Sequence, residues 1–436
     1  MRGQVATLGL EELGRGDAAP GGVLDLTDAD LAAGLSSIED ALAAIARGEL
    51  VIVVDDVDRE NEGDLVGAAE LVTDEHINTM VTVGRGLVCA PMTGARLDAL
   101  GLGPMVPEAA GREETAFTVS VDLEVPGSTG ISAADRARTI RHLVDEATRP
   151  EQLRRPGHVF PLRARPGGVL EREGHTEAAV DLARMAGLAP AGVICEIMNP
   201  DGTMARMPEL LAMAQRRGLH LITIADLVVH RRRHERQVTR VTETVLPTDH
   251  GDFRAIGFRA DDGQEHLVLA RGELGDVPLV RVHSECLTGD VLGSRRCDCG
   301  EQLEASLAAI AEDGHGALVY LRGHEGRGIG LVEKLRAYAL QETGSDTVEA
   351  NVELGHAPDA REYHAAAQML LDLGVDRVRL LTNNPIKGQA LTAFGVTVTE
   401  RVAVEVAPNE HNVDYLTTKQ RKMGHELRLV AEGGRP

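Results

Sequence analysis

The sequence predicts an α/β protein of two different modules, an N-terminal α+β half followed by a layered α/β half. Apolar runs typical of buried strands alternate with helical patterns throughout, which favours layers of helices on sheets. A charged run, RRRHERQ at 231–237, divides this pattern, and neither half repeats the other. The length, 436 residues, suits two or three domains. We therefore expect an extension over 1–30 and modules over 31–231 and 232–436.

The first half begins with a helix predicted near 36–48. Ser36 and Glu39 have the spacing of a capping box, and Gly48 lies near the end of the helix. The apolar run VIVV, 51–54, predicts a buried strand. The stretch DDVDRENEGD, 55–64, would be the loop that leaves this strand.

Further elements follow from the same patterns. In the first half we expect a strand, a helix and a strand leading into a helix, over 191–198, 207–218 and 220–230. In the second half we expect strand, helix, helix and strand over 316–321, 331–342, 364–374 and 377–382. Because strands and helices alternate there, we expect parallel strands.

Composition excludes several classes of protein. The formal charge of −23 argues against general binding to nucleic acid or anionic membranes. The N-terminus lacks an apolar signal region, and no run approaches the roughly 18 apolar residues of a membrane span. Five cysteines, an odd number in a long chain, do not indicate a disulfide framework. We expect a cytoplasmic protein with a flexible extension over 1–30.

The acidic loop has two interpretations. Six of its ten residues are carboxylates, which is typical of a solvated, flexible connection. Its position after a buried strand instead favours a ligand site, and hard oxygen ligands suit Mg²⁺. The segment REGHTEAAVDLA, 172–183, offers Arg172 as a phosphate clamp and His175 as a metal ligand or acid–base group. A structural His175 remains the alternative.

These segments are similar, in order and spacing, to 3,4-dihydroxy-2-butanone 4-phosphate synthase. The resemblance covers about residues 30–230 and includes DRENEGDL, GISAADRARTI, RPGHVFPLRA, REGHTEAAVDLA, GVICEIMNPDGTMAR and LITIADL. It implies conversion of ribulose 5-phosphate to dihydroxybutanone phosphate and formate with Mg²⁺ or Mn²⁺.

The resemblance also implies roles for individual residues. Glu60 and His175 would hold the metal, and His158 and Glu196 would transfer protons. The residues expected to bind substrate are Arg59, Glu60, Asp64, Arg172, Glu173, Gly174, His175, Thr176 and Glu196. Val57 stands where the family has an acid, so Mg²⁺ affinity or rate would suffer here if that acid serves the metal.

The second half contains a cysteine cluster. Cys286, Cys297 and Cys299 form C-x10-C-x-C, which in a cytoplasmic chain favours metal over a redox pair. Three thiolates without an obvious fourth protein ligand predict a catalytic zinc site, where zinc lowers the pKa of water toward about 7. Cys89 and Cys195 lie in apolar runs, and we expect them to be buried and inert.

Downstream, GALVYLRGHEGRGIGLVEKLRAYAL predicts strand, Gly-rich turn and helix. Backbone amides at such a helix start bind phosphate, although the turn alone fits a dinucleotide-binding fold almost as well. Together with the thiolate cluster it indicates a nucleotide hydrolase. LLTNNPIKG places Thr382 and Lys387 on a similar loop.

From about 232 the chain resembles GTP cyclohydrolase II in RVHSEC, GSRRCDCG, GHEGRGIGL, DTVEAN, DAREY and LLTNNPIK. The resemblance implies that GTP loses formate and pyrophosphate, with Zn²⁺ on the three cysteines. The implied GTP contacts are Arg281, Val282, His283, Ser284, Glu285, Gln302, Glu325, Gly326, Arg327, Thr347, Thr382 and Lys387.

Three further residues match catalytic positions of this family. Asp359 matches the proton acceptor, and Arg361 the residue described as nucleophile. A guanidinium stays protonated, so we interpret Arg361 as a clamp on the α-phosphate. Tyr338 matches a position near the purine, with a core aromatic as the alternative.

The two resemblances predict a bifunctional enzyme that makes both starting units of riboflavin, and they imply homodimers. The partners would be small-molecule substrates. Two alternatives remain: one active half with the other as a scaffold, or a nicotinamide-dependent oxidoreductase built on GRGIG, which would leave the three thiolates unexplained.

Overall fold

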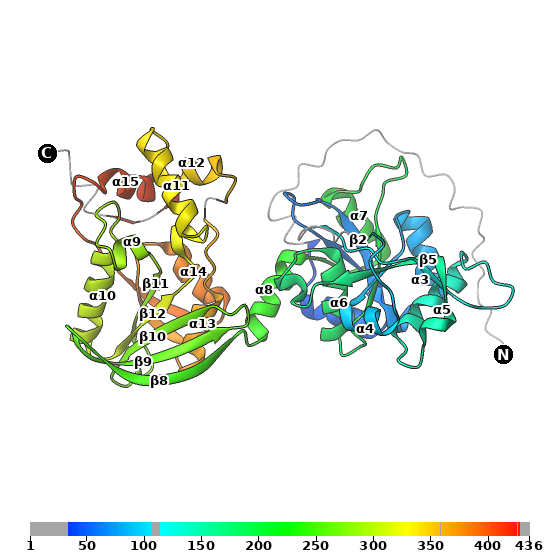
Figure 1. Cartoon of the computed structure of the whole chain (residues 1–436), viewed down its shortest axis with the longest axis horizontal. Coiled ribbons are helices and arrows are strands. Elements are labelled where there is room, and N and C mark those ends of the chain that lie inside the picture. The colour runs from blue at the N-terminus through cyan, green and yellow to red at the C-terminus, as the bar shows by residue number, and fades with distance from the viewer. Residues whose placement is uncertain (1–33, 107–113, 358, 425, 428–436) are drawn as a thin grey trace, which may run out of the picture. The chain divides into compact units, whose positions relative to one another are not determined.

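The computed structural model describes residues 34–106, 114–357, 359–424 and 426–427. The predicted extension over 1–30 lies outside these residues. The chain divides into two compact units, Met1–Val229 and His230–Pro436. Each unit is built around one seven-stranded sheet (Figure 1). The predicted α/β class is confirmed.

The sheet of the first unit is mixed, with strand order β4-β5-β3-β6-β2-β1-β7. Its strands are β1 (Val51–Val54), β2 (Gly63–Ala68), β3 (Cys89–Thr93), β4 (Val121–Leu123), β5 (Leu153–Ala164), β6 (Gly192–Glu196) and β7 (Leu221–Thr223). Its helices are α2 (Ile38–Ala46), α3 (Asp74–Thr79), α4 (Gly94–Ala99), α5 (Ala133–Val144), α6 (His175–Met185), α7 (Met207–Arg217) and α8 (Ile224–His234), with short turns η1 (Ala69–Leu71), η2 (Met80–Gly84), η3 (Pro150–Gln152) and η4 (Gly168–Leu170).

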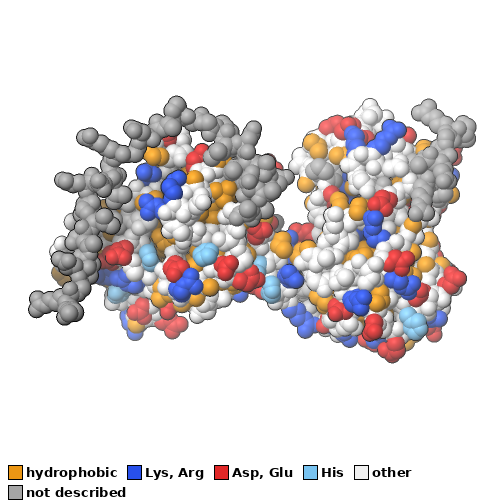
Figure 2. Space-filling model, turned by 180° about the vertical axis from the view of Figure 1, so that it is seen from behind, with side chains coloured by type: hydrophobic (Ala, Val, Ile, Leu, Met, Phe, Trp, Pro, Cys, Tyr) orange, Lys and Arg blue, Asp and Glu red, His pale blue; other side chains and the backbone are white. Residues whose placement is uncertain are grey.

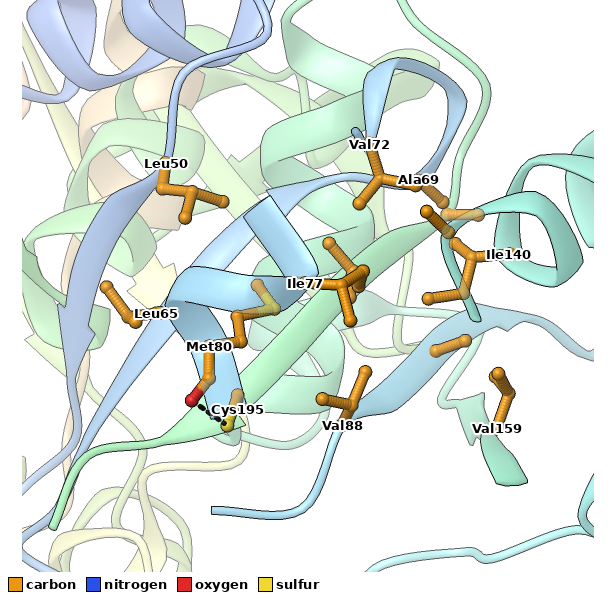
Figure 3. Packing of buried hydrophobic residues seen from close by; sticks show 14 of the residues in the cluster. Leu50, Leu65, Ala69, Val72, Ile77, Met80, Val88, Ile140, Val159 and Cys195 are labelled. Carbon is orange, nitrogen blue, oxygen red and sulfur yellow. Dashed lines mark hydrogen bonds between the residues drawn. The ribbon is translucent and has the colours of Figure 1, made fainter. Parts of the chain in front are cut away.

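Helices cover both faces of this sheet, which explains why VIVV is apolar at every position. Ile52 and Val54 belong to a core shared with α3, α5 and α7, whereas Val51 and Val53 belong to a core shared with α2, α6 and α8. Figure 3 shows the first of these cores. There the Cys195 thiol donates to the Met80 carbonyl, and burial raises the Cys195 pKa to about 12. Cys89 and Cys195 are buried, as predicted.

The predicted start of the first helix is wrong by one residue. Ser37, not Ser36, is the N-cap, because its hydroxyl accepts from the Asp40 amide. Ser36 serves β7 instead: its amide donates to the Leu221 carbonyl at 2.8 Å. A tertiary contact therefore decides between two adjacent serines.

The sheet of the second unit has the order β14-β13-β11-β12-β10-β9-β8. Its strands are β8 (Val238–Thr248), β9 (Gly251–Ala260), β10 (Glu265–Arg271), β11 (Leu279–Ser284), β12 (Gly316–Leu321), β13 (Arg377–Leu381) and β14 (Thr397–Val402). Its helices are α9 (Leu287–Asp290), α10 (Cys299–Asp313), α11 (Leu331–Glu342), α12 (Thr347–Glu353), α13 (His364–Asp372), α14 (Pro385–Ala393) and α15 (Val413–Met423), with the turn η5 (Glu325–Arg327).

The parallel strands predicted for this half occur in only part of its sheet. β11, β12, β13 and β14 pair in parallel, but β8, β9 and β10 form an antiparallel meander joined to β12. Short connections after β8 and β9 allow only hairpins, so antiparallel pairing follows. Helices α13 and α14 pack on one face and α10 on the other. Figure 1 shows α11, α12 and α15 together beyond one end of the sheet.

The charged run that suggested a seam is partly helical, because α8 continues to His234. Figure 2 shows basic and acidic side chains interspersed over the visible face of each unit. No helix in the described part of the chain combines the length and apolar character that crossing a membrane requires.

Gly192 lets α6 lie directly on β6. A Cβ there would stand 2.6 Å from Ala179 Cβ and 3.2 Å from the Ala179 backbone. We expect Gly192→Ala to push α6 outward and destabilise the unit by about 1–3 kcal/mol. Faster hydrogen exchange across 175–185, measured by mass spectrometry, would show it. The control is Gly103→Ala, where a Cβ meets nothing within 4 Å; equal exchange in both variants would contradict the prediction.

Candidate active sites

The first candidate site lies at the C-terminal end of β1, in the hairpin that joins β1 to β2. The buried carboxylate of Asp55 holds this acidic loop together. Its Oδ1 accepts from the Glu62 amide at 2.7 Å, and its Oδ2 accepts from the Glu60 amide at 3.0 Å and from Arg59 Nη1 at 2.8 Å. Arg206 from the start of α7 also donates to the Glu60 carbonyl. The loop is therefore fastened by hydrogen bonds to its own first carboxylate.

Two predicted metal ligands meet beside this loop. His175 Nδ1 lies 3.9 Å from Glu60 Oε2, while Nε2 lies 3.2 Å from the Val53 carbonyl. Since a carbonyl only accepts, Nε2 carries the proton and Nδ1 presents a lone pair toward Glu60. Burial lowers the His175 pKa, which favours this neutral form. Asp55, Glu60 and His175 offer ligand atoms within 4.8 Å of one another.

Asp64 and Glu196 stand on adjacent strands of the same site. Strand pairing places Val53, Asp64 and Glu196 side by side across β1, β2 and β6. Val51, Val66 and Ile194 form the next row on that face and pack in the α6 core. Because side chains alternate along a strand, Asp64 and Glu196 project on the face that α6 covers. Burial and nearby carboxylates, chiefly Glu196, raise the Asp64 pKa well above its ordinary range.

Glu196 has a fixed orientation. Its Oε2 accepts from the Leu87 amide at 2.7 Å. A Cβ at Gly86 would lie 2.4 Å from the same oxygen, so only glycine leaves room for this carboxylate. Sequence reasoning identified Glu196 but not the glycine that accommodates it.

His158 lies on the same sheet edge but away from the Glu60–His175 pair. The register through β6, β3 and β5 puts it level with Glu196 with β3 between them, roughly 10 Å away at normal strand spacing. Its Nδ1 donates to Asp122 Oδ2 at 2.8 Å, and Asp122 also accepts from the His158 amide and from Arg154. Asp122, which sequence reasoning missed, orients this ring.

Arg172 is already engaged by protein groups. Its guanidinium donates to Glu177 Oε2 at 2.6 Å and to Thr115 Oγ1 at 3.2 Å. Gly174 must lack a side chain, since a Cβ there would lie 2.2 Å from Arg172 Nη1. Gly174 is also the N-cap of α6, and no side chain caps this helix start, where His175 and Thr176 are buried. Glu173, in the same turn, is exposed.

Asp55 generates a testable prediction. Asp55→Asn keeps the shape but removes the charge that binds Arg59 and two amides, bonds of the charge-assisted kind. We expect hydrogen exchange across 56–62 to rise at least about tenfold without added metal. Asp58→Asn, on the exposed side of the loop, is the matched control. If the two variants exchange alike, Asp55 is not the anchor.

The second candidate site surrounds the three predicted thiolates. Cys286 precedes α9 and Cys299 begins α10, which brings both beside Cys297. Cys286 and Cys297 sulfurs lie 3.7 Å apart, and all three sulfurs lie within 4.8 Å. Two sulfurs each about 2.3 Å from a tetrahedral zinc ion would be about 3.8 Å apart, so the spacing fits zinc. Gly289 provides the room, since a Cβ there would meet all three cysteines.

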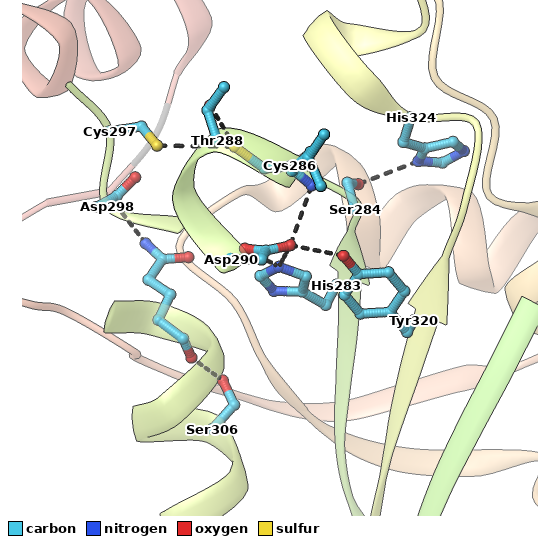
Figure 4. A network of polar contacts seen from close by, with 12 residues as sticks. His283, Ser284, Cys286, Thr288, Asp290, Cys297, Asp298, Ser306, Tyr320 and His324 are labelled. Carbon is cyan, nitrogen blue, oxygen red and sulfur yellow. Dashed lines mark hydrogen bonds and ion pairs between the residues drawn. The ribbon is translucent and has the colours of Figure 1, made fainter. Parts of the chain in front are cut away.

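The three sulfurs share their protons unequally. Hydrogen bonds from Cys297 and Cys299 lower the Cys286 pKa, and the bond to Cys286 raises the Cys297 pKa to about 11. Cys286 is therefore the first to ionise. Figure 4 shows its amide donating to Asp290, which also accepts from His283 and Tyr320.

A cavity opens beside the cluster. Its lining includes the three cysteines together with Ser284, Glu285, Gly326, Arg327, Tyr338, Thr347 and Arg361. Tyr338 is half-buried on this wall, with the Arg296 guanidinium 5.1 Å from its ring centroid, so it is not a core aromatic. Burial raises its pKa, which keeps the phenol protonated.

A second lobe continues from this cavity and is strongly cationic. It is lined by Arg281, Arg327, Arg361, Lys387 and Lys419, with Thr382 beside them. Burial, and then repulsion from Arg281, Arg361 and Lys419, lowers the Lys387 pKa well below its ordinary value. An anion in this lobe would relieve the repulsion.

Some predicted GTP contacts are engaged in the protein. Gln302 bridges Arg281 and Asp298, and Val282 packs in the core while its carbonyl accepts from Lys387. The His283 ring is buried against Asp290. Glu325 is committed to Lys334 and to the Leu287 amide. These residues support the walls of the site through their contacts with other protein groups.

Asp359 and Arg361 form an ion pair of 2.5 Å. Although burial opposes it, this hydrogen bond raises the pKa of Arg361 above its usual value and lowers that of Asp359. Arg361 is therefore a cation and Asp359 a carboxylate. This agrees with our interpretation of Arg361 as a clamp rather than a nucleophile.

Two α/β units, one with an oxygen–imidazole cluster and one with a three-thiol cluster beside a cationic cavity, are typical of a bifunctional enzyme. Family models match in both units: 3,4-dihydroxy-2-butanone 4-phosphate synthase over residues 39–230 and GTP cyclohydrolase II over 239–403. "Riboflavin biosynthesis protein RibBA" of Salinispora arenicola is 58% identical over 90% of this chain and 94% of its own. The chain belongs to this family of bifunctional riboflavin biosynthesis enzymes.

Solved structures similar to this chain include two synthases. RibBX, "a two domain 3,4-dihydroxy-2-butanone 4-phosphate synthase" from A. baumannii, is 37% identical, covers 85% of this chain and 100% of its own, and has a TM-score of 0.63. A 3,4-dihydroxy-2-butanone 4-phosphate synthase "in complex with two Magnesium ions" is 47% identical, covers 46% of this chain and 99% of its own, and has a TM-score of 0.44.

Proposed function

We propose that the N-terminal unit converts ribulose 5-phosphate to 3,4-dihydroxy-2-butanone 4-phosphate and formate. The C-terminal unit hydrolyses GTP to 2,5-diamino-6-(5-phosphoribosylamino)pyrimidin-4(3H)-one, formate and pyrophosphate. The observation that carries this proposal is the separation of a hard and a soft ligand cluster into different units. Thiolates are poor ligands for Mg²⁺, which prefers oxygen, so the two clusters differ in the metal that they favour.

In the N-terminal unit, Glu60 and His175 would hold Mg²⁺ or Mn²⁺, which supplies charge stabilisation for enediolate oxygens when bound. Asp55 is near enough to join them, although its oxygens already accept three hydrogen bonds. The start of α6, Gly174 to Thr176, would bind the substrate phosphate through backbone amides. Arg172 would keep that turn in its conformation. Arg59 and Glu173, which also belong to the predicted set of substrate-binding residues, would contact the substrate beside it.

Proton transfer in this unit would fall to Asp64 and Glu196. Burial raises the Asp64 pKa, which favours the protonated form that can donate, and Glu196 faces the same space as its partner. Repeated enolisation needs a group that gives a proton and another that takes one. His158, oriented by Asp122, is a further proton carrier at the same sheet edge.

In the C-terminal unit, Cys286, Cys297 and Cys299 would hold Zn²⁺, which activates water for attack on the purine when bound. The cationic lobe would take the triphosphate, with Arg361 on the α-phosphate and Lys387 further along it. Asp359, ionised beside Arg361, would accept a proton. Tyr338 would contact the purine, and Thr347 and Thr382 line the two lobes.

Family resemblance also supports a homodimeric, cytoplasmic enzyme with only small-molecule substrates. Light scattering after size-exclusion chromatography tests the dimer directly. A monomer at micromolar concentration would contradict it.

Replacing one thiolate separates the two activities. Cys297→Ser leaves two soft ligands, so zinc should be lost and formate release from GTP should fall by more than about 100-fold. Formate release from ribulose 5-phosphate should stay within about twofold, as for distant independent sites. Zinc content is checked by mass spectrometry.

The matched control is Arg295→Ala, an exposed change in the same loop that should spare both activities. Zinc-free Cys297→Ser protein that still opens GTP would contradict the proposed mechanism. Loss of both activities in a folded, soluble variant would contradict the independence of the units.

Val57 is the one departure in the acidic loop, and this residue is 71% exposed. Val57→Glu adds a carboxylate that can reach solvent-side cations at little steric cost. If the position serves the metal, the Mg²⁺ concentration for half-maximal synthase activity should fall several-fold. Val57→Gln, of similar size but uncharged, is the control, and identical Mg²⁺ titrations for Glu and Gln would show that charge here is irrelevant.

A further inference from the structure

Lys334 is a buried cation that neither the motifs nor the proposed mechanism uses. It lies on α11, within LVEKLRAYAL, and its side chain reaches the start of α9. Its Nζ donates to Thr288 Oγ1 at 2.8 Å and to Cys286 Sγ at 3.1 Å, and it pairs with Glu325 Oε1 at 2.5 Å. A lysine ammonium has three donors, and these three partners use all of them.

Glu325 also binds Leu287, the residue between Cys286 and Thr288. Its Oε2 accepts from the Leu287 amide at 2.6 Å. Lys334 and Glu325 together therefore hold three consecutive residues, Cys286, Leu287 and Thr288. On the other side, Asp290 accepts from the Cys286 amide at 3.0 Å (Figure 4). Hydrogen bonds thus hold Cys286 at both its backbone amide and its sulfur.

We propose that Lys334 is a positioning residue of the thiolate metal site, acting through a direct N–H···S hydrogen bond to Cys286. The inference rests on the proposed zinc site. Three thiolates around a divalent cation carry one net negative charge, and a buried ammonium beside them balances it. A donor on the sulfur also withdraws electron density from it, so the metal keeps more of its Lewis acidity.

A simpler role is that Lys334 is only the counterion of buried Glu325. The roles predict different results for the pair of variants Lys334→Met and Lys334→Met/Glu325→Gln. If Lys334 only neutralises Glu325, the double variant should behave as wild type, because no unpaired charge remains. If Lys334 acts on Cys286, both variants should be altered alike. The double variant also decides the matter should Lys334→Met fold poorly.

Two measurements on the full-length protein test the proposal. The first is the rate at which zinc passes to a chromogenic chelator, expected to rise about 10- to 100-fold in both variants, the usual effect of losing a partner of a metal ligand. The second is the thiolate-to-metal charge-transfer band of cobalt-substituted protein, which should move to longer wavelength as Cys286 regains electron density. Arg336→Met removes an exposed cation from the same helix and should change neither.

An unshifted cobalt band and wild-type zinc release in Lys334→Met would overturn the inference, as would their restoration in the double variant. Failure of the wild-type protein to bind zinc or cobalt is a distinct result, which would overturn the proposed zinc site itself.

Discussion

Among the residues that the structure describes, several buried ions are paired with groups of the same unit, and this pairing shapes both sites. An unpaired buried charge is strongly destabilising, so the fold supplies partners from its own chain. Asp55 is matched by Arg59 and two amides, Arg172 by Glu177, and Glu325 by Lys334. The charged groups that remain accessible after this pairing determine which ligand each site can bind.

In the N-terminal unit, Asp55 and Arg172 are held by protein groups, whereas Glu60, with a 46% exposed side chain, accepts from Arg59 and also faces His175. In the C-terminal unit, positive charges outnumber negative charges in one lobe of the site. Several cations line this lobe, where the Lys387 ammonium donates to the Val282 carbonyl and lies 5.5 Å from the Tyr363 ring centroid. A polyphosphate would complete such a lobe, whereas a neutral ligand would leave its repulsion in place.

The sequence indicated that the three cysteines form a cluster, but it did not indicate which side chains contact the candidate site residues. C-x10-C-x-C was enough to foresee the sulfur cluster, because cysteine has few other uses in such a pattern. Lys334 could not be found this way: it lies 48 residues from Cys286 in an ordinary amphipathic helix, and only the fold brings them together. The same holds for Asp122, whose bond to His158 spans 36 residues.

Local sequence patterns likewise predicted individual elements of the fold but not the features that depend on tertiary contacts. VIVV predicted a buried strand, and the structure has one, which is buried on both faces. Neighbouring serines could not be told apart as helix caps, because the β7 contact of Ser36 is not visible in sequence. The antiparallel meander β8–β10 was missed because its first strand is exposed and lacks an apolar run.

The claim that one chain carries two working sites is tested most directly by supplying the two substrates to the same purified, metal-replete protein. Ribulose 5-phosphate labelled throughout with ¹³C and GTP labelled at C8 with ¹³C are each given alone and again with the other substrate unlabelled, and labelled formate is followed by NMR. The account predicts formate from both, at rates that do not depend on the presence of the other substrate. Formate from only one substrate would mean that the other unit is a scaffold, and would contradict the account.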